Sequence, residues 1–191
     1  MTTHPEKHNL RAWTDINKHK LGKGIKKPRF RKAKQWVIQN RILMAVLIVE
    51  DVKLSELAKE VGVAPRTVAS WIYEGVKPTE EYRAHISHKF GLPQSVLFFD
   101  DRHYDQIPAW TGKRFLKRVL LGEKKNRILT GLFAVHDLSP SDFSKEMNLA
   151  PATTRKYMHQ GKKPAPEVGE IYCSFFGLPE EILFYETERR N

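Results

Sequence analysis

The chain repeats itself at a fixed spacing of 86 residues. Residues 40–100 align with residues 126–186 without a gap, and 22 of the 61 aligned positions are identical. The matching segments include NRIL at the start of each copy and FGLP near its end. A long repeat in two copies is typical of tandem domains, because a solenoid needs at least three shorter units. We therefore expect two small domains of one fold.

Each copy has the apolar spacing of short helices. In the first copy, apolar residues recur at helical spacing over residues 42–49 and again over 54–61. A third helix is expected to open at Pro65, or at Pro151 in the second copy, and to end near the following glycine. Two more helical stretches follow KP and FGLP, and no alternating strand pattern competes with them. The sequence predicts an all-α protein.

The second and third helices of each copy are separated by a tight turn. Gly62 occupies this turn in the first copy and Asn148 in the second, and these residue types best tolerate a left-handed backbone. Ser139 is placed to cap the helix before the second turn, with Pro140 in its first turn and Asp142 three residues after the cap. A short helix, a turn and a second helix make up a helix-turn-helix unit.

The segments LAKEVGVAPRTVASWIYEGVKP and FSKEMNLAPATTRKYMHQGKKP, each closed by FGLP and LFF or LFY, carry a family resemblance. They resemble the Cro/repressor-like (Xre-type, lambda-repressor-like) helix-turn-helix domains of bacteria and phages. The two copies cover about two thirds of the chain. The resemblance implies five-helix domains whose third helix enters the major groove of DNA. One extra residue before the glycine in WIYEG departs from the commonest pattern, which affects how that helix ends.

Positive charge lies mostly outside the two copies. The net charge is +11, and residues 1–39 hold eleven Lys/Arg against two Asp/Glu, whereas both copies are slightly acidic. Basic blocks of this kind favour a polyanionic partner, above all nucleic acid. We expect a flexible basic arm at 1–34, a first domain at 35–100, a connector at 101–113 and a second domain at 114–191.

The arm is expected to contact phosphates or a groove of DNA. The candidate cations are Lys23, Lys26, Lys27, Arg29, Arg31, Lys32 and Lys34. Two alternatives stay open: a solvated tail that only confers solubility, and a segment whose aromatic residues Trp13 and Phe30 dock on the first domain.

The outward face of each third helix carries short polar and cationic groups, which suit a DNA groove better than a protein interface. An arginine there can pair bidentately with guanine, and a hydroxyl can bond a base edge or a phosphate. The second copy is the more basic and is expected to make more phosphate contacts. The predicted DNA-binding residues are Pro65, Arg66, Thr67, Ala69, Ser70, Tyr73, Lys77, Pro151, Ala152, Thr153, Arg155, Lys156, His159, Lys162 and Lys163.

No catalytic or cofactor motif is present, so we expect no enzyme activity, no cofactor and no metal. A single cysteine, Cys173, excludes a disulfide scaffold. The longest apolar run, ILMAVLIV, is too short to span a bilayer. Together with the absence of an apolar signal segment at the N-terminus, this predicts a cytoplasmic, nucleoid-associated protein without a membrane partner.

The leading functional hypothesis is a sequence-specific, double-stranded-DNA-binding transcription regulator, phage- or mobile-element-like, that reads two half-sites with one chain. An architectural, replication or partition DNA-binding protein is the first alternative. A protein-interaction module of the antitoxin or anti-regulator kind is the second. Self-association, or a partner such as RNA polymerase or a regulatory protein, is compatible with the leading hypothesis.

Overall fold

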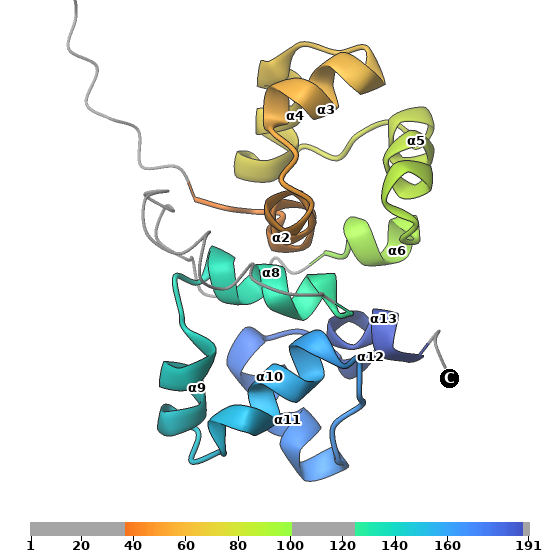
Figure 1. Cartoon of the computed structure of the whole chain (residues 1–191). Helices are drawn as coiled ribbons and strands as arrows, with labels where there is room; N and C mark the ends of the chain where they lie inside the picture. The colour runs from red at the N-terminus through yellow and green to blue at the C-terminus, as the bar shows by residue number, and fades with distance from the viewer. Residues whose placement is uncertain (1–36, 101–124, 189–191) are drawn as a thin grey trace, which may run out of the picture. The chain divides into compact units, whose positions relative to one another are not determined.

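Every regular element in the described parts of the chain is a helix (Figure 1). A computed structural model describes residues 37–100 and 125–188, and all of these belong to one compact unit, Gln35–Asn191. The predicted all-α class is therefore confirmed for these residues. In the first copy the helices are α2 (Arg41–Val49), α3 (Leu54–Val61), α4 (Pro65–Tyr73), α5 (Glu80–Phe90) and α6 (Gln94–Leu97). In the second they are α8 (Arg127–Val135), α9 (Pro140–Glu146), α10 (Pro151–His159), α11 (Pro166–Phe176), α12 (Glu180–Leu183) and α13 (Tyr185–Glu188).

In each copy, an asparagine side chain bonds both to the start of the first helix and to the end of the fifth helix. The Asn40 side-chain oxygen accepts from the backbone N–H of Leu43 at 2.8 Å, which caps α2. Its amide nitrogen donates to the carbonyl of Leu97, at the end of α6, at 3.0 Å. Asn126 makes both bonds at the equivalent places of the second copy. In each copy, one side chain thus caps the first helix and holds the end of the fifth helix against it.

The turns between the second and third helices have the predicted backbone. Gly62 has φ 79° and Asn148 has φ 54°, both in the left-handed region. The Ser139 hydroxyl accepts from the backbone N–H of Asp142 at 3.0 Å and so caps α9 as expected. The third helix of each copy begins at a proline, again as predicted. These local signals are sufficient to place α4 and α10.

The inner faces of α4 and α10 are packed in the core. Three residues of each helix are buried on this side: Val68, Trp71 and Ile72 in α4, and Thr154, Tyr157 and Met158 in α10. Since these side chains recur every three or four residues, they fix which side of each helix is left for solvent.

A buried hydrogen-bonded chain crosses the core of the second copy. The Thr154 hydroxyl lies 2.6 Å from the Ser144 hydroxyl and 2.7 Å from the Tyr172 phenol. Ser144 in turn donates to the carbonyl of Pro140 at 2.8 Å. Burial raises the pKa of Tyr172 to about 12, so the phenol keeps its proton and can donate. The first copy replaces this chain with purely apolar residues, Ala58, Val68 and Ile86, all buried.

We expect Thr154→Val to lower the free energy of unfolding by about 1–3 kcal/mol, because it leaves the buried hydroxyls of Ser144 and Tyr172 short of a partner. The triple variant Ser144→Ala, Thr154→Val, Tyr172→Phe should recover most of that loss, since it removes the stranded groups as well. Urea unfolding followed by helical circular dichroism measures both. A triple variant less stable than Thr154→Val alone would contradict the argument.

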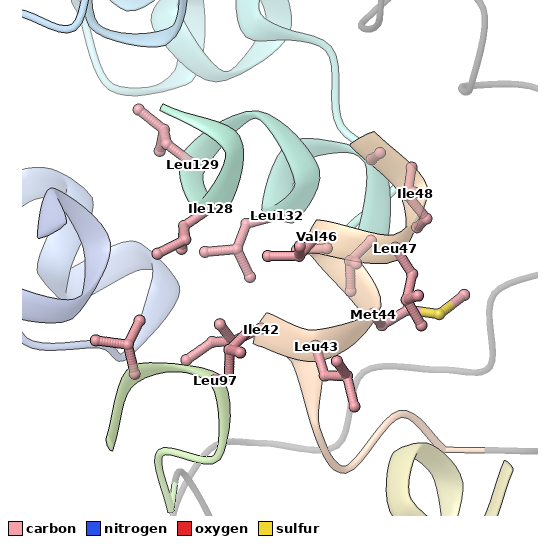
Figure 2. Close-up of a cluster of buried hydrophobic side chains, with 14 of the residues drawn as sticks. Ile42, Leu43, Met44, Val46, Leu47, Ile48, Leu97, Ile128, Leu129 and Leu132 are labelled. Carbon is pink, nitrogen blue, oxygen red and sulfur yellow. The ribbon is translucent and has the colours of Figure 1, made fainter. Parts of the chain in front are cut away.

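The two copies meet through their first helices, α2 and α8. Figure 2 shows Val46 of α2 and Leu132 of α8 pointing toward one another within a shared apolar cluster. The helices lie close together where Gly131 faces Ala45. A Cβ added to Gly131 would lie 2.3 Å from the Ala45 carbonyl oxygen, so close that the backbone of one helix would have to shift. All nine residues of α2 are buried, which agrees with a helix covered on every side.

Candidate nucleic-acid interface

The outer face of α4 divides into an exposed start and a half-buried remainder. Pro65 and Arg66 are exposed, while Thr67, Ala69, Ser70 and Tyr73 are half-buried. Arg66 is therefore the exposed cation of α4. The face is short because α4 has only nine residues, and its other side is taken up by the core.

Two residues of this face are engaged with the protein itself. The Ser70 hydroxyl donates to the carbonyl of Thr67 at 2.8 Å, which leaves its oxygen only as an acceptor for a ligand. Tyr73 packs against the core, and burial raises the pKa of its phenol. Both can still border a ligand, but neither projects as Arg66 does.

The outer face of α10 is more open and more basic. Ala152, Arg155 and Lys156 are exposed together with Pro151, whereas Thr153 is half-buried. His159 closes the face and is half-buried too. This face thus combines two cations with small neighbours, which leaves room for a polyanion to approach.

Basic residues continue after each of these helices. Lys77 is exposed and lines a hollow beside Trp71 and Phe98. Lys162 is exposed, and Lys163 forms a 3.0 Å ion pair with Glu180 in which both side chains remain partly accessible, at 48% and 36%. An ion pair this exposed is weak and can be exchanged for a phosphate.

Four of the predicted cations in the described parts of the chain are not committed to a partner there. Within residues 37–100 and 125–188, no ion pair or hydrogen bond involves the side chains of Arg66, Arg155, Lys156 or Lys162. A polyanion can therefore approach these four cations without breaking an ion pair among the described residues. By contrast, Lys89 of α5 is paired with Glu60 at 2.5 Å.

The first turns of α4 and α10 add at most one free backbone donor each to the same surfaces, because Pro65 and Pro151 have no N–H group. The N–H groups of Thr67 and Thr153 already donate to the carbonyls of Ala64 and Ala150, at 2.9 and 2.8 Å. The residues at the cap positions, Ala64 and Ala150, have no side chain able to cap. Uncapped N–H groups at the start of a helix attract anions, and phosphate oxygens of DNA are often held in this way. The exposed arginine and the helix start therefore favour the same kind of ligand.

Several predicted features lie outside the described residues. These are the seven arm cations from Lys23 to Lys34, the connector at 101–113 and the start of the second domain at 114. Among the residues that are described, no three His, Cys, Asp or Glu side chains come together as a metal site. Nor does any helix there have the length and apolar character needed to cross a membrane.

Sequence reasoning missed a second set of polar residues. Arg41 and Arg127 each follow the cap asparagine of a first helix, and a charged side chain is expected at the surface unless it is paired. Instead Arg41 is only 2% exposed, and both guanidinium groups bond to the other copy. Their identity in the two copies was the available signal, but identity alone does not say that a residue is buried between domains.

Comparisons with protein-family models, curated protein sequences and solved structures find no match for this chain.

Proposed function

We propose that the chain is a sequence-specific transcription regulator that binds double-stranded DNA and reads two half-sites, one with α4 and one with α10. The observation that carries the proposal is the two-sided character of these helices. Each follows a left-handed turn, is buried along one side, and has on the other an exposed arginine without a partner among the described residues and a first turn without a side-chain cap. In this reading each copy is a helix-turn-helix domain.

The two helices take different roles in recognition. Arg66, one residue after the opening proline of α4, is placed for bidentate contact with a guanine. Arg155 lies four residues after the opening proline of α10 and has Lys156 beside it. The α10 surface therefore combines base contact with more phosphate neutralisation, which sets the position of the protein on the duplex. A cytoplasmic, nucleoid-associated location is part of the same proposal.

Arg66→Ala and Arg155→Ala test the assigned faces. Each should weaken binding to a site selected from random DNA by about 1–3 kcal/mol if the pairing with guanine is bidentate. Fluorescence anisotropy at one fixed salt concentration, with labelled duplexes, measures the loss. The matched controls are Arg66→Lys and Arg155→Lys, which keep the charge but lose the planar fork. They should retain affinity for random DNA and lose preference for the selected site.

The same binding measurements distinguish the proposed regulator from an architectural DNA-binding protein and from a protein-interaction module. Wild-type affinity and preference in both alanine variants would show that α4 and α10 do not read the DNA. If random DNA competed as well as the selected site, an architectural or partition role would replace specific regulation, because specific binders favour their site by about 10³-fold or more. An absence of DNA affinity would leave the protein-interaction module.

A further inference from the structure

The hydrogen bonds between the two copies come in reciprocal pairs. Nη1 of Arg41 donates to the carbonyl of Phe176 at 2.8 Å, and Nη2 of Arg127 donates to the carbonyl of Phe90 at 2.9 Å. Arg41 and Arg127 occupy the same position of the repeat, and so do Phe90 and Phe176. The same bond is therefore made twice, once from the first copy to the second and once from the second copy to the first.

The same two arginines make a second reciprocal pair. Nη1 of Arg127 forms a 2.8 Å ion pair with Glu50, and Nη1 of Arg41 lies 3.2 Å from Nε2 of His136. Glu50 and His136 are again equivalent positions, each just beyond a first helix. Burial and the neighbouring guanidinium lower the pKa of His136 to about 3. The neutral imidazole therefore accepts a hydrogen bond from Arg41, whereas the Glu50 carboxylate forms an ion pair with Arg127.

Between these polar contacts, equivalent residues face each other. Ala45 meets Gly131, and Val46 points toward Leu132 (Figure 2). Both pairs join positions 86 residues apart. A residue that contacts its own counterpart must lie near a two-fold axis, because only a two-fold rotation brings identical positions together while exchanging the copies.

Contacts of this kind distinguish two ways of joining repeated domains. Copies related by a two-fold axis bury the same patch on both sides, whereas copies arranged head to tail join two different patches. The reciprocal bonds and the self-facing pairs of α2 and α8 fit only the first arrangement. A two-fold axis that relates α2 to α8 relates the rest of each copy as well, α4 to α10 included.

We infer that the chain is a two-fold dimer within a single polypeptide, and that its DNA target is an inverted repeat of two unlike half-sites occupied by one chain. This inference rests on the proposed DNA-binding function. It adds the orientation of the half-sites and the stoichiometry, which tandem domains do not by themselves determine. Head-to-tail domains would read a direct repeat instead. B-form DNA itself has two-fold axes perpendicular to its length, which an inverted repeat extends to its sequence.

A recognition-swap variant tests the orientation. Four substitutions give α10 the outward residues of α4: Ala152→Arg, Arg155→Ala, Lys156→Ser and His159→Tyr. The full-length wild type and the variant are each used to select duplexes from a random library, and the number of chains per selected duplex is measured by analytical ultracentrifugation. Thermal unfolding followed by circular dichroism checks that the variant is folded.

The wild type should select two unlike half-sites in inverted orientation. The variant should select an inverted repeat of identical half-sites at the same spacing, bound by one chain. Reversing one half-site should weaken binding by tenfold or more, since even one mismatched base pair typically costs roughly 5- to 150-fold. Direct repeats, isolated half-sites or two chains per site would overturn the inference and leave DNA reading intact. Failure of the wild type to enrich any sequence would overturn the proposed function itself, and the inverted site with it.

Discussion

Gly131→Ala is expected to lower the free energy of unfolding by about 3 kcal/mol, at the upper end of the usual cost of overpacking. Gly131 has an ordinary helical backbone in the middle of α8, where alanine would normally stabilise a helix by roughly 1 kcal/mol. Here the added Cβ would lie 2.3 Å from the Ala45 carbonyl oxygen and 2.6 Å from the Ala45 Cα. These are backbone atoms of a buried helix, so they cannot rotate away, and α2 and α8 must separate.

Gly169→Ala is the matched control for this experiment. Gly169 also lies in a helix of the second copy, but the nearest atoms to an added Cβ, on Glu180 and Pro164, would be 3.6 Å away. That is an ordinary contact, so this variant should be at least as stable as the wild type. Urea unfolding of both variants gives the comparison. Equal stability of the two variants would mean that the helices do not approach as closely as described.

Deletion of residues 1–34 should weaken binding to all DNA sequences by a similar factor and flatten its salt dependence. The deleted segment holds all eleven Lys/Arg of residues 1–39, while the first copy beside it is slightly acidic. Each phosphate neutralised on duplex DNA contributes about 0.9 to the slope of log affinity against log salt. If about six of these cations contact phosphates, the slope falls by about 5. The preference for the selected site over random DNA should persist, because α4 and α10 are unchanged.

A charge-only variant separates the electrostatic role of the arm from docking by its aromatic residues. It replaces the seven predicted arm cations with glutamine and keeps the length of the arm together with Trp13 and Phe30. This variant should reproduce most of the change in slope caused by the deletion. A salt slope that stays at the wild-type value in both proteins would show that the arm is a solubility tail or a protein-docking segment.

The part of the fold that sequence reasoning anticipated is the part controlled by neighbouring residues. A proline opens α4 and α10, Ser139 caps α9, and Gly62 and Asn148 take the left-handed turn because few other residues accept it. Repetition strengthened two of these signals, since both copies carry the opening proline and a residue that accepts the left-handed turn, whereas Lys53 stands in the first copy where Ser139 stands in the second. The short α13, in contrast, has no counterpart among the described residues of the first copy and was not anticipated.

The contact between the copies could not be anticipated in the same way. Apolar spacing indicates that α2 has a buried side, but it does not say what covers the helix. The pairing of Arg41 with His136 and of Arg127 with Glu50 depends on groups 95 and 77 residues apart. Burying a guanidinium is costly unless it is bonded, so the sequence alone favours exposure. The partial burial of Tyr73, which the sequence placed on the outward face of α4, could not be predicted for the same reason. Local spacing does not show how far the core extends.

The α2–α8 contact has a consequence for how such a protein responds to its own abundance. When two DNA-binding domains come from separate chains, their pairing depends on concentration, and occupancy of the DNA rises steeply around a threshold. Here the pairing partner is carried on the same polypeptide, so its effective concentration does not change when the protein is diluted. Occupancy of a site should then rise in simple proportion to the number of molecules before it saturates. Under the proposed function, each copy is also encoded separately, so a mutation in α4 or α10 would alter the DNA preference of that helix while the other helix keeps its own.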